Sequence, residues 1–328
     1  MSRNTNVKRT IVEAVPFYTV LPNTKLDFSL YEKIGEDQFR KILAADTIYT
    51  SHQRRKLEEK GTAELYVSIK EKAQYYQYME AQLRSIATSG SIPLRDKAMS
   101  IYDGASKIIE NIFEDPESRE YAEKVRILAE STADVLMSNA GATRSLIEVG
   151  SFDYTTHTHS VDVAVFATGF GKHLGMNRDE LAKLGYSAMM HDVGKSRVPE
   201  KIINKKGRLS QDEFEEVQRH ATYGYFILKA LNETDTDVLG GVRYHHEKYD
   251  GSGYPERRRG EEIPLFAQII GISDVYSALS TRRTYKDAHS PYEALTVMKN
   301  EMLNSFNKRL LLEFIRFMGP NSLDQYPV

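Results

Sequence analysis

Two short stretches near the start of the chain alternate between apolar and polar residues. The apolar positions are Leu26, Phe28 and Leu30 in the first stretch, and Leu65, Val67 and Ile69 in the second. A period of two places successive side chains on opposite faces, which is typical of a half-buried strand. The pattern therefore predicts two strands in this region.

Helical spacing follows both predicted strands. It predicts one helix from Glu36 to Leu43 and another from Glu71 to Ile86. The run Ser89-Gly90-Ser91-Ile92-Pro93 then has the composition of a boundary. Together these segments predict a small α/β domain over residues 1–90, which we expect to be a regulatory or partner-binding domain.

From Leu94 onward the apolar positions recur at helical spacing, and alternating stretches nearly vanish. Breaks at residues 115–116, 139–141 and 149–151 separate the first of these helices. We expect the later helices over residues 160–174, 178–191, 210–231, 238–246, 264–281 and 291–301. The whole chain is thus predicted to be mainly α. A helical connector over residues 91–149 packs on an all-α bundle over residues 150–328, after the α/β domain.

Composition restricts the setting of this bundle. Hydrophobic residues make up 41% of the chain and charged residues 27%, which is typical of a soluble globular protein. No apolar run approaches the roughly 20 residues that span a bilayer, and the N-terminus lacks a signal-peptide pattern, so we expect a cytoplasmic protein with no membrane partner. The net charge of -2 gives no global attraction for nucleic acid, so DNA is not an expected partner.

Histidine is concentrated in the predicted bundle. Eight of the nine histidines lie between His157 and His289, and several are paired with each other or with aspartate. The chain has no cysteine, so a metal here would be held by nitrogen and oxygen ligands. Imidazoles and carboxylates in this number suit divalent iron, manganese or zinc better than magnesium or calcium.

The sharpest local signal is the pair His191-Asp192, which ends a largely apolar predicted helix. We expect Gly194 to close that helix. An aspartate in this position can bridge two cations while its neighbouring histidine ligates one of them. Lys195 lies one turn away, where it can meet a phosphate oxygen or a leaving group.

These residues are part of a longer motif series. His245 and His246 open a run that continues through Gly253-Tyr254-Pro255, and Gly260 to Pro264 and Ile272 to Leu279 follow it. In this order the series resembles the HD superfamily of metal-dependent phosphohydrolases and, within it, the HD-GYP family of cyclic-di-GMP phosphodiesterases. The resemblance covers residues 150 to 300 approximately. It implies an HD-type helical bundle and a role in bacterial second-messenger signalling.

The resemblance also implies a ligand set for two metal ions. His159, His191, Asp192 and Asp274 would hold the first ion, and Asp192, His220, His245 and His246 the second, with Asp192 as the bridge. Some members bind a third metal through a glutamate four residues before the first histidine, where this chain has Thr155. We therefore predict two divalent ions. Iron is the expected metal, and manganese is the second choice.

Catalysis follows from the chemistry of such ions. Two cations about 3.5–4 Å apart can share a hydroxide and hold it in line with a phosphorus atom. By resemblance, Asp192 and Lys195 are the catalytic residues, and Lys195, Arg283 and Lys286 contact phosphate. The family's Arg-Pro-Tyr triplet reads Arg283-Thr284-Tyr285 here, and loss of the proline loosens the loop that aims the arginine.

The Gly253-Tyr254-Pro255 loop has two interpretations. Its glycines can serve backbone geometry alone. The resemblance instead implies that Tyr254 shapes substrate entry or contacts a partner protein such as a diguanylate cyclase; the N-terminal domain is a second candidate surface for a partner.

Three functions remain open from the sequence. The first is hydrolysis of cyclic-di-GMP to a linear dinucleotide or to mononucleotides. The second is a receptor or scaffold that binds the nucleotide but turns it over poorly. The third keeps the chemistry but acts on another cyclic dinucleotide such as cyclic GMP-AMP.

Overall fold

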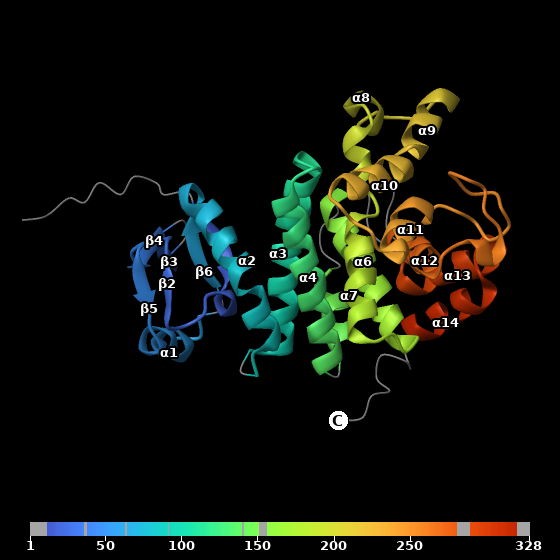
Figure 1. Cartoon of the computed structure of the whole chain (residues 1–328). Coiled ribbons are helices and arrows are strands. Elements are labelled where there is room, and N and C mark those ends of the chain that lie inside the picture. Colours follow the sequence, from blue (N-terminus) through green and yellow to red (C-terminus); the bar gives the residue numbers. More distant parts are fainter. Residues whose placement is uncertain are drawn as a thin grey trace, which may run out of the picture. The chain divides into compact units, whose positions relative to one another are not determined.

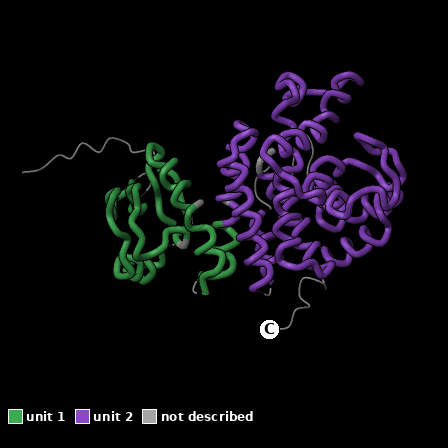
Figure 2. Tube along the Cα trace, viewed as in Figure 1, with its two compact units in different colours: residues 1–100 green, residues 101–328 purple. Residues whose placement is uncertain are grey.

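The computed structural model describes residues 12–35, 38–62, 64–90, 92–139, 141–150, 156–280 and 289–319. The chain divides into two compact units, unit 1 over residues 1–100 and unit 2 over residues 101–328 (Figure 2). The finer division at residues 90 and 149 that the sequence suggests stays a prediction.

Unit 1 is built on antiparallel strands with two α-helices (Figure 1). A four-stranded sheet has the order β1-β6-β3-β4, and β2 pairs with β5 in a two-stranded sheet. The elements are β1 (Val12–Pro16), η1 (Phe17–Thr19), β2 (Thr24–Leu26), β3 (Leu30–Gly35), β4 (Gln38–Leu43), β5 (Thr47–Tyr49), α1 (Ser51–Glu59), β6 (Glu64–Ser68), η2 (Ile69–Glu71) and α2 (Lys72–Thr88).

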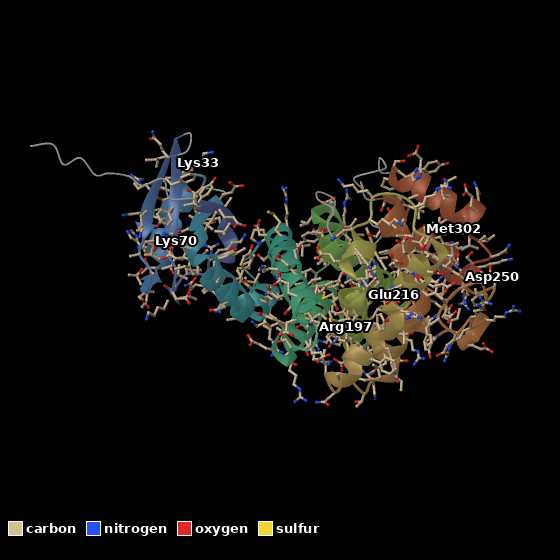
Figure 3. The ribbon with its side chains drawn as sticks, turned by 90° about the horizontal axis from the view of Figure 1, so that it is seen from above. Lys33, Lys70, Arg197, Glu216, Asp250 and Met302 are labelled. Atoms are coloured by element: carbon tan, nitrogen blue, oxygen red, sulfur yellow. The ribbon has the colours of Figure 1, made fainter. Side chains whose placement is uncertain are left out.

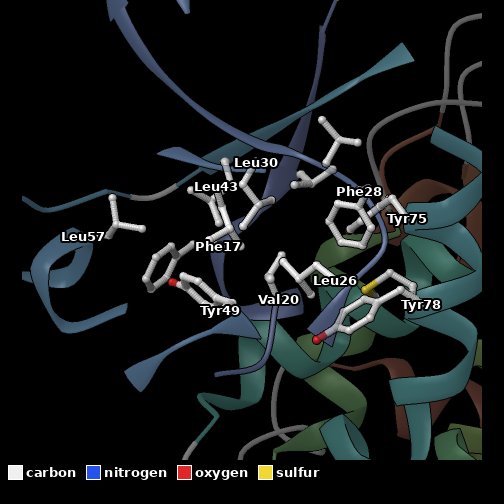
Figure 4. Close-up of a cluster of buried hydrophobic side chains, with 14 of the residues drawn as sticks. Phe17, Val20, Leu26, Phe28, Leu30, Leu43, Tyr49, Leu57, Tyr75 and Tyr78 are labelled. Atoms are coloured by element: carbon white, nitrogen blue, oxygen red, sulfur yellow. The ribbon is translucent and has the colours of Figure 1, made fainter. Parts of the chain in front are cut away.

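Aromatic and aliphatic side chains fill the core of unit 1 (Figure 4). Phe28 lies edge-on to both Tyr75 and Tyr78 of α2, with ring centroids 5.6 and 5.5 Å apart. The Tyr78 hydroxyl accepts a hydrogen bond from the Leu21 backbone amide at 2.9 Å, so this buried ring keeps a partner for its polar end. These contacts attach α2 to the strands of unit 1.

Two predictions for unit 1 are wrong in detail. The helix expected from Glu36 to Leu43 is absent, because residues 38–43 form β4 and pair with β3. Pairing with a neighbouring strand here outweighs local helix propensity. The single strand expected around Leu26 to Leu30 is divided between β2 and β3, although Leu26, Phe28 and Leu30 are all fully buried as the alternation predicts.

Every regular element among the described residues of unit 2 is a helix. Its first helix, α3, begins in unit 1 and ends in unit 2. The elements are α3 (Leu94–Glu114), α4 (Arg119–Ser138), α5 (Ala142–Val149), α6 (Thr156–His173), α7 (Arg178–Met190), η3 (Val193–Arg197), α8 (Glu200–Ile203), α9 (Gln211–Gln218), α10 (His220–Ala230), α11 (Thr236–Tyr244), η4 (Gly260–Glu262), α12 (Leu265–Ser280), α13 (Pro291–Glu301) and α14 (Lys308–Met318).

The central helices of unit 2 pack around α7, which contacts α4, α6 and α11, while α12 contacts α6 and α11. Helix α7 starts with a capping box, in which the Asn177 side chain accepts from the Glu180 amide and Glu180 accepts from the Asn177 amide. Its residues Leu181, Leu184 and Met189 are buried on the core side. The predicted mainly α fold, with a bundle after a small strand-containing domain, is confirmed.

One predicted helix of unit 2 is interrupted. Residues 210–231 form two helices, α9 and α10, which meet at Arg219. At this break the His220 Nδ1 atom lies 2.7 Å from the Val217 carbonyl oxygen. The His220 side chain thus contacts a backbone carbonyl group of α9, and His220 is the first residue of α10.

Candidate metal centre

Five elements of unit 2 bring the predicted ligands together. His159 lies on α6, His191 caps the C-terminal end of α7, and Asp192 follows it directly. His220 begins α10, and Asp274 lies on α12. His245 caps the C-terminal end of α11, and His246 follows. Helix ends and tightly packed helix faces therefore supply all seven side chains.

Two glycines permit the close approach of these elements. A Cβ atom on Gly194 would lie 1.9 Å from the carbonyl oxygen of His220, so η3 can contact α10 only without a side chain there. A Cβ atom on Gly271 would lie 2.5 Å from the carbonyl oxygen of His245, which has the same effect between α12 and the end of α11. Gly194 does not close α7 as the sequence suggested. It instead brings η3 and α10 together.

The first group of donor atoms belongs to His159, His191 and Asp192, and these atoms lie within 4.8 Å of one another. His191 Nε2 lies 3.3 Å from Asp192 Oδ2. Asp274 joins the group through its Oδ1 atom, 3.0 Å from Nε2 of His159. These four residues are the predicted first ligand set.

The second group belongs to Asp192, His220, His245 and His246, again with donor atoms within 4.8 Å of one another. Nε2 of His220 lies 3.3 Å from Asp192 Oδ1 and 3.3 Å from Nε2 of His245. Asp192 thus offers Oδ2 toward His191 and Oδ1 toward His220. It is the residue that the two groups share, as expected for a bridging carboxylate.

Backbone carbonyl groups hold three of the imidazole rings. The Nδ1 atoms of His191, His220 and His245 lie 2.6 to 2.8 Å from the carbonyl oxygens of Ala188, Val217 and Val242, in each case three residues earlier. A carbonyl oxygen can only accept, so these Nδ1 atoms carry the proton in the neutral ring. Nε2 is then left with a lone pair for a cation.

The site contains buried polar atoms that a cation would satisfy. Nε2 of His191 and Oδ1 of Asp192 are buried and have no hydrogen-bond partner among the described residues. Buried donors and acceptors without partners are uncommon in folded proteins, because each costs free energy. The donor set of imidazoles and carboxylates therefore fits divalent transition metals.

The protonation states agree with this fit. Burial lowers the pKa of His245 and His246 well below the usual range, and neighbouring histidines lower it further. Burial alone would raise the pKa of Asp192, but Lys195 and His191 hold it well below its usual value. Near neutral pH His245 and His246 are thus neutral and Asp192 is ionised, which are the forms that bind cations. Burial alone would lower the pKa of His191, but the adjacent Asp192 carboxylate raises it above its usual value.

Lys195 and Tyr254 border the two groups. The Lys195 ammonium donates to Oδ2 of Asp192 and stays partly exposed, with 26% of its side chain accessible. The Tyr254 ring lies against His246, with centroids 4.7 Å apart and planes inclined by 33°. Two of the four predicted substrate contacts therefore lie beside the predicted metal ligands.

The loop that carries Tyr254 is attached to the C-terminal part of unit 2. The amide of Tyr249 donates to the carbonyl oxygen of Ser305 at 2.9 Å. Asp250 in this loop and Met302 after α13 accordingly lie on the same side of unit 2 (Figure 3). The Tyr254 amide also donates to the His246 carbonyl oxygen at 3.3 Å, which links the loop directly to a predicted ligand.

Several sequence predictions fall outside the described residues. Arg283 and Lys286, the other two predicted phosphate contacts, belong to the stretch 281–288, and Thr155 to the stretch 151–155.

Sequence reasoning missed Ser277. Its hydroxyl lies 3.0 Å from Nδ1 of His159, on the side of the ring away from Asp274. Ser277 follows Asp274 by three residues on α12, and residues at this spacing share a helix face. The three-residue spacing from Asp274 could have identified Ser277 in the sequence.

A sequence model of the HD domain family matches residues 118–310, which is more than half of the chain. The chain belongs to the HD domain family. The resemblance predicted from the motif series is thereby confirmed. HD domains bind divalent metals, in agreement with the donor groups around Asp192.

Two curated relatives and one solved structure extend this comparison. Over 193 residues the HD domain protein is 31% identical to a cyclic di-GMP phosphodiesterase of Pseudomonas aeruginosa, a match that covers 59% of this chain and 46% of the relative. Over 147 residues it is 35% identical to a 3'3'-cGAMP-specific phosphodiesterase of Vibrio cholerae, covering 45% and 34%. The chain thus spans less than half the length of these relatives.

The solved structure is an HDG"Y"P protein from Bdellovibrio bacteriovorus, with a TM-score of 0.66 at 19% identity. The match covers 94% of this chain and 99% of that one, so the fold is shared along nearly the whole length. Among the described residues, no helix is long and apolar enough to cross a membrane.

Proposed function

We propose that this HD domain protein hydrolyses the phosphodiester bonds of cyclic-di-GMP with the help of two divalent metal ions. Iron is the expected metal, and manganese is the second choice. The observation that carries the proposal is the position of Asp192, shared between two groups of donor atoms. A carboxylate shared in this way is what a two-metal phosphohydrolase requires. Bound cations would lower the pKa of a water molecule and neutralise phosphate charge.

The residues of the chain have distinct roles in this proposal. His159, His191 and Asp274 hold the first cation with Asp192, and His220, His245 and His246 hold the second with Asp192. Because their rings are fixed by carbonyl groups, His191, His220 and His245 present Nε2 in set directions.

Lys195 supplies a positive charge beside Asp192, where it can neutralise a phosphate oxygen as the bond to phosphorus breaks. Tyr254 closes the side of the site next to His246 and offers a ring for contact with a base. Arg283 and Lys286 remain predicted phosphate contacts.

The names of two relatives support cyclic dinucleotides as the substrate class. One relative is named for cyclic di-GMP and the other for 3'3'-cGAMP, and both are cyclic dinucleotides. The similarity to the second relative supports cyclic GMP-AMP as an alternative substrate. Protein partners at the Gly253-Tyr254-Pro255 loop or at unit 1 remain proposals, as does a cytoplasmic location.

The test is a chromatographic assay with protein loaded anaerobically with iron or manganese, offered cyclic-di-GMP and cyclic GMP-AMP in parallel. We expect metal-dependent appearance of the linear dinucleotide or of GMP. Asp192→Ala should remove this activity and reduce bound metal from about two ions per chain to nearly none. Asp212→Ala, which changes an exposed aspartate of α9, is the matched control and should behave as the wild type.

Four results would contradict parts of the proposal. Cyclic-di-GMP that binds but stays intact would support a receptor. Preferential cleavage of cyclic GMP-AMP would reassign the substrate. Metal retained at full stoichiometry in Asp192→Ala would show that this residue is not the bridge, and three ions per chain would show a further site.

A further inference from the structure

Unit 1 has a cavity of its own, and none of its lining residues belongs to the metal centre. It has a volume of about 190 Å³ and lies where β3, β4, β5 and α1 meet. Engineered apolar cavities of roughly 150 Å³ bind benzene. The cavity therefore has room for a small organic molecule with one ring or a branched chain.

The inner part of the cavity is apolar. Leu43, Leu57 and the ring of Tyr49 line it, and these residues are 8%, 6% and 1% exposed. The Tyr49 hydroxyl is buried and offers no surface to the cavity. A ligand would therefore meet the apolar ring of Tyr49 and not its hydroxyl group.

The outer part of the cavity is charged. Glu32 lies on the same face of β3 as Leu30, and Arg40 lies directly opposite Glu32 on β4. The Glu32 carboxylate accepts from Arg40, and its other oxygen lies 3.5 Å from the Lys60 ammonium. Both oxygens of the only acidic side chain in the lining are thus engaged.

The charge that remains is positive. Arg40, Lys56 and Lys60 face a single carboxylate across the lining, which leaves a net charge of two positive units. The side chains of Arg40 and Lys60 are 57% and 55% exposed, so they form the mouth of the cavity. A guanidinium carries five N–H donors, and pairing with one carboxylate oxygen leaves donors for a second anion.

We propose that this cavity is a binding site for a small carboxylate with an aromatic or branched aliphatic body. The carboxylate contacts Arg40 and Lys60 at the mouth, and the apolar body packs against Leu43 and Leu57. The ring of Tyr49 packs against the same apolar body. A cationic ligand is disfavoured, because Glu32 is already paired with two cations.

The test uses the full chain and benzoate, a carboxylate on a single aromatic ring. In a saturation-transfer NMR titration we expect saturable binding with a dissociation constant on the order of 0.1–1 mM, as suits a ligand of this size. The neutral analogue benzyl alcohol should bind at least tenfold more weakly, because it lacks the charge that pairs with Arg40. Equal binding of the two compounds, or no saturation by about 10 mM benzoate, would overturn the proposal.

Two variants locate the binding. Arg40→Gln should weaken it about tenfold, whereas Lys41→Gln, one residue along β4 and outside the cavity lining, should leave it unchanged.

Benzoate binding that persists unchanged in Arg40→Gln would place the carboxylate elsewhere, for instance at the metal centre, and would also overturn the proposal. Because the probe binds unit 1 and is no cyclic dinucleotide, this result is independent of whether the chain hydrolyses cyclic-di-GMP.

Discussion

Nε2 of His159 lies 3.0 Å from Oδ1 of Asp274, although 115 residues separate them in the chain. The contact joins α6 to α12 inside the predicted metal centre. It also fixes one side of the His159 ring, while Ser277 contacts the other side through Nδ1 at 3.0 Å. His159 is therefore oriented by two residues of the same face of α12.

Ser277→Ala tests this orientation. Loss of the hydroxyl removes the contact with Nδ1 of His159 while leaving every proposed ligand in place. We expect metal affinity to fall about tenfold, since outer contacts of metal-bound histidines typically contribute 10-fold to 100-fold. Titration of the metal-free protein with manganese measures the effect. Ser280→Ala is the matched control, because the Ser280 hydroxyl donates to the Tyr276 carbonyl and not to the centre.

Lys195→Ala separates catalysis from metal binding. The variant loses the cation beside Asp192, so phosphate charge is stabilised less well as the bond breaks. We expect kcat to fall about a hundredfold. Bound metal should be unchanged or held more tightly, because Asp192 no longer pairs with an ammonium. Lys201→Ala in α8 serves as the control, and parallel loss of metal and activity in Lys195→Ala would refute the separate roles.

Gly194→Ala tests the close packing of η3 on α10. The new methyl group would overlap the His220 carbonyl oxygen, a backbone atom that cannot turn aside. We expect the free energy of unfolding to fall by about 3 kcal/mol or more. Bound metal should fall as well, because Asp192 and His220 would be pushed apart. Chemical denaturation measures the first effect, and Gly90→Ala is the control, since a Cβ atom there meets nothing within 4 Å. An unchanged denaturation midpoint would count against this packing role.

Asp162 predicts a pH dependence of stability. This carboxyl group is buried on α6 and accepts a hydrogen bond from the Tyr102 hydroxyl at 3.0 Å. Burial raises the pKa of Asp162 to about 7, against roughly 3.9 in the unfolded chain. Between these values the folded state holds a proton that the unfolded state has lost. Stability from this group is therefore full below pH 4 and declines as the pH rises toward 7.

Asp162→Asn mimics the protonated form at every pH. The variant should become more stable than the wild type as the pH rises from about 4 to 7, with a difference of up to about 4 kcal/mol at pH 8. Urea unfolding at several pH values measures the difference. Asp212→Asn on the surface should show no such trend. A constant difference between Asp162→Asn and the wild type across this range would show that Asp162 is ionised in the folded protein.

The sequence predicted the helical bundle and the grouping of the seven proposed ligands well, for physical reasons. The ligands lie at the ends and on the faces of helices that the spacing of apolar residues predicts. The motifs also follow one another along the chain in the order of the family that the sequence resembles. The strand β4 was missed because its pairing with β3 is not visible in the local spacing of residues 38–43. The break at Arg219 was missed because it accompanies a side-chain contact of His220 with a carbonyl group.

Other features depend on three-dimensional contact alone. The role of Gly194 is set by the backbone of α10, about 26 to 30 positions along the chain, and no local pattern reports it. The cavity at Tyr49 likewise arises where three strands and a helix meet. Ser277 is the exception, since its spacing from Asp274 was available in the sequence.

The carbonyl groups of Ala188, Val217 and Val242 fix three rings from within the same stretch of chain that carries each ring. The direction of each Nε2 lone pair is thus set by a contact within one stretch of chain. In the folded protein these three rings are held in place by the backbone that carries them. A cation arriving at the folded protein meets little remaining side-chain disorder, so most of the entropy loss for building its site belongs to folding and not to metal binding.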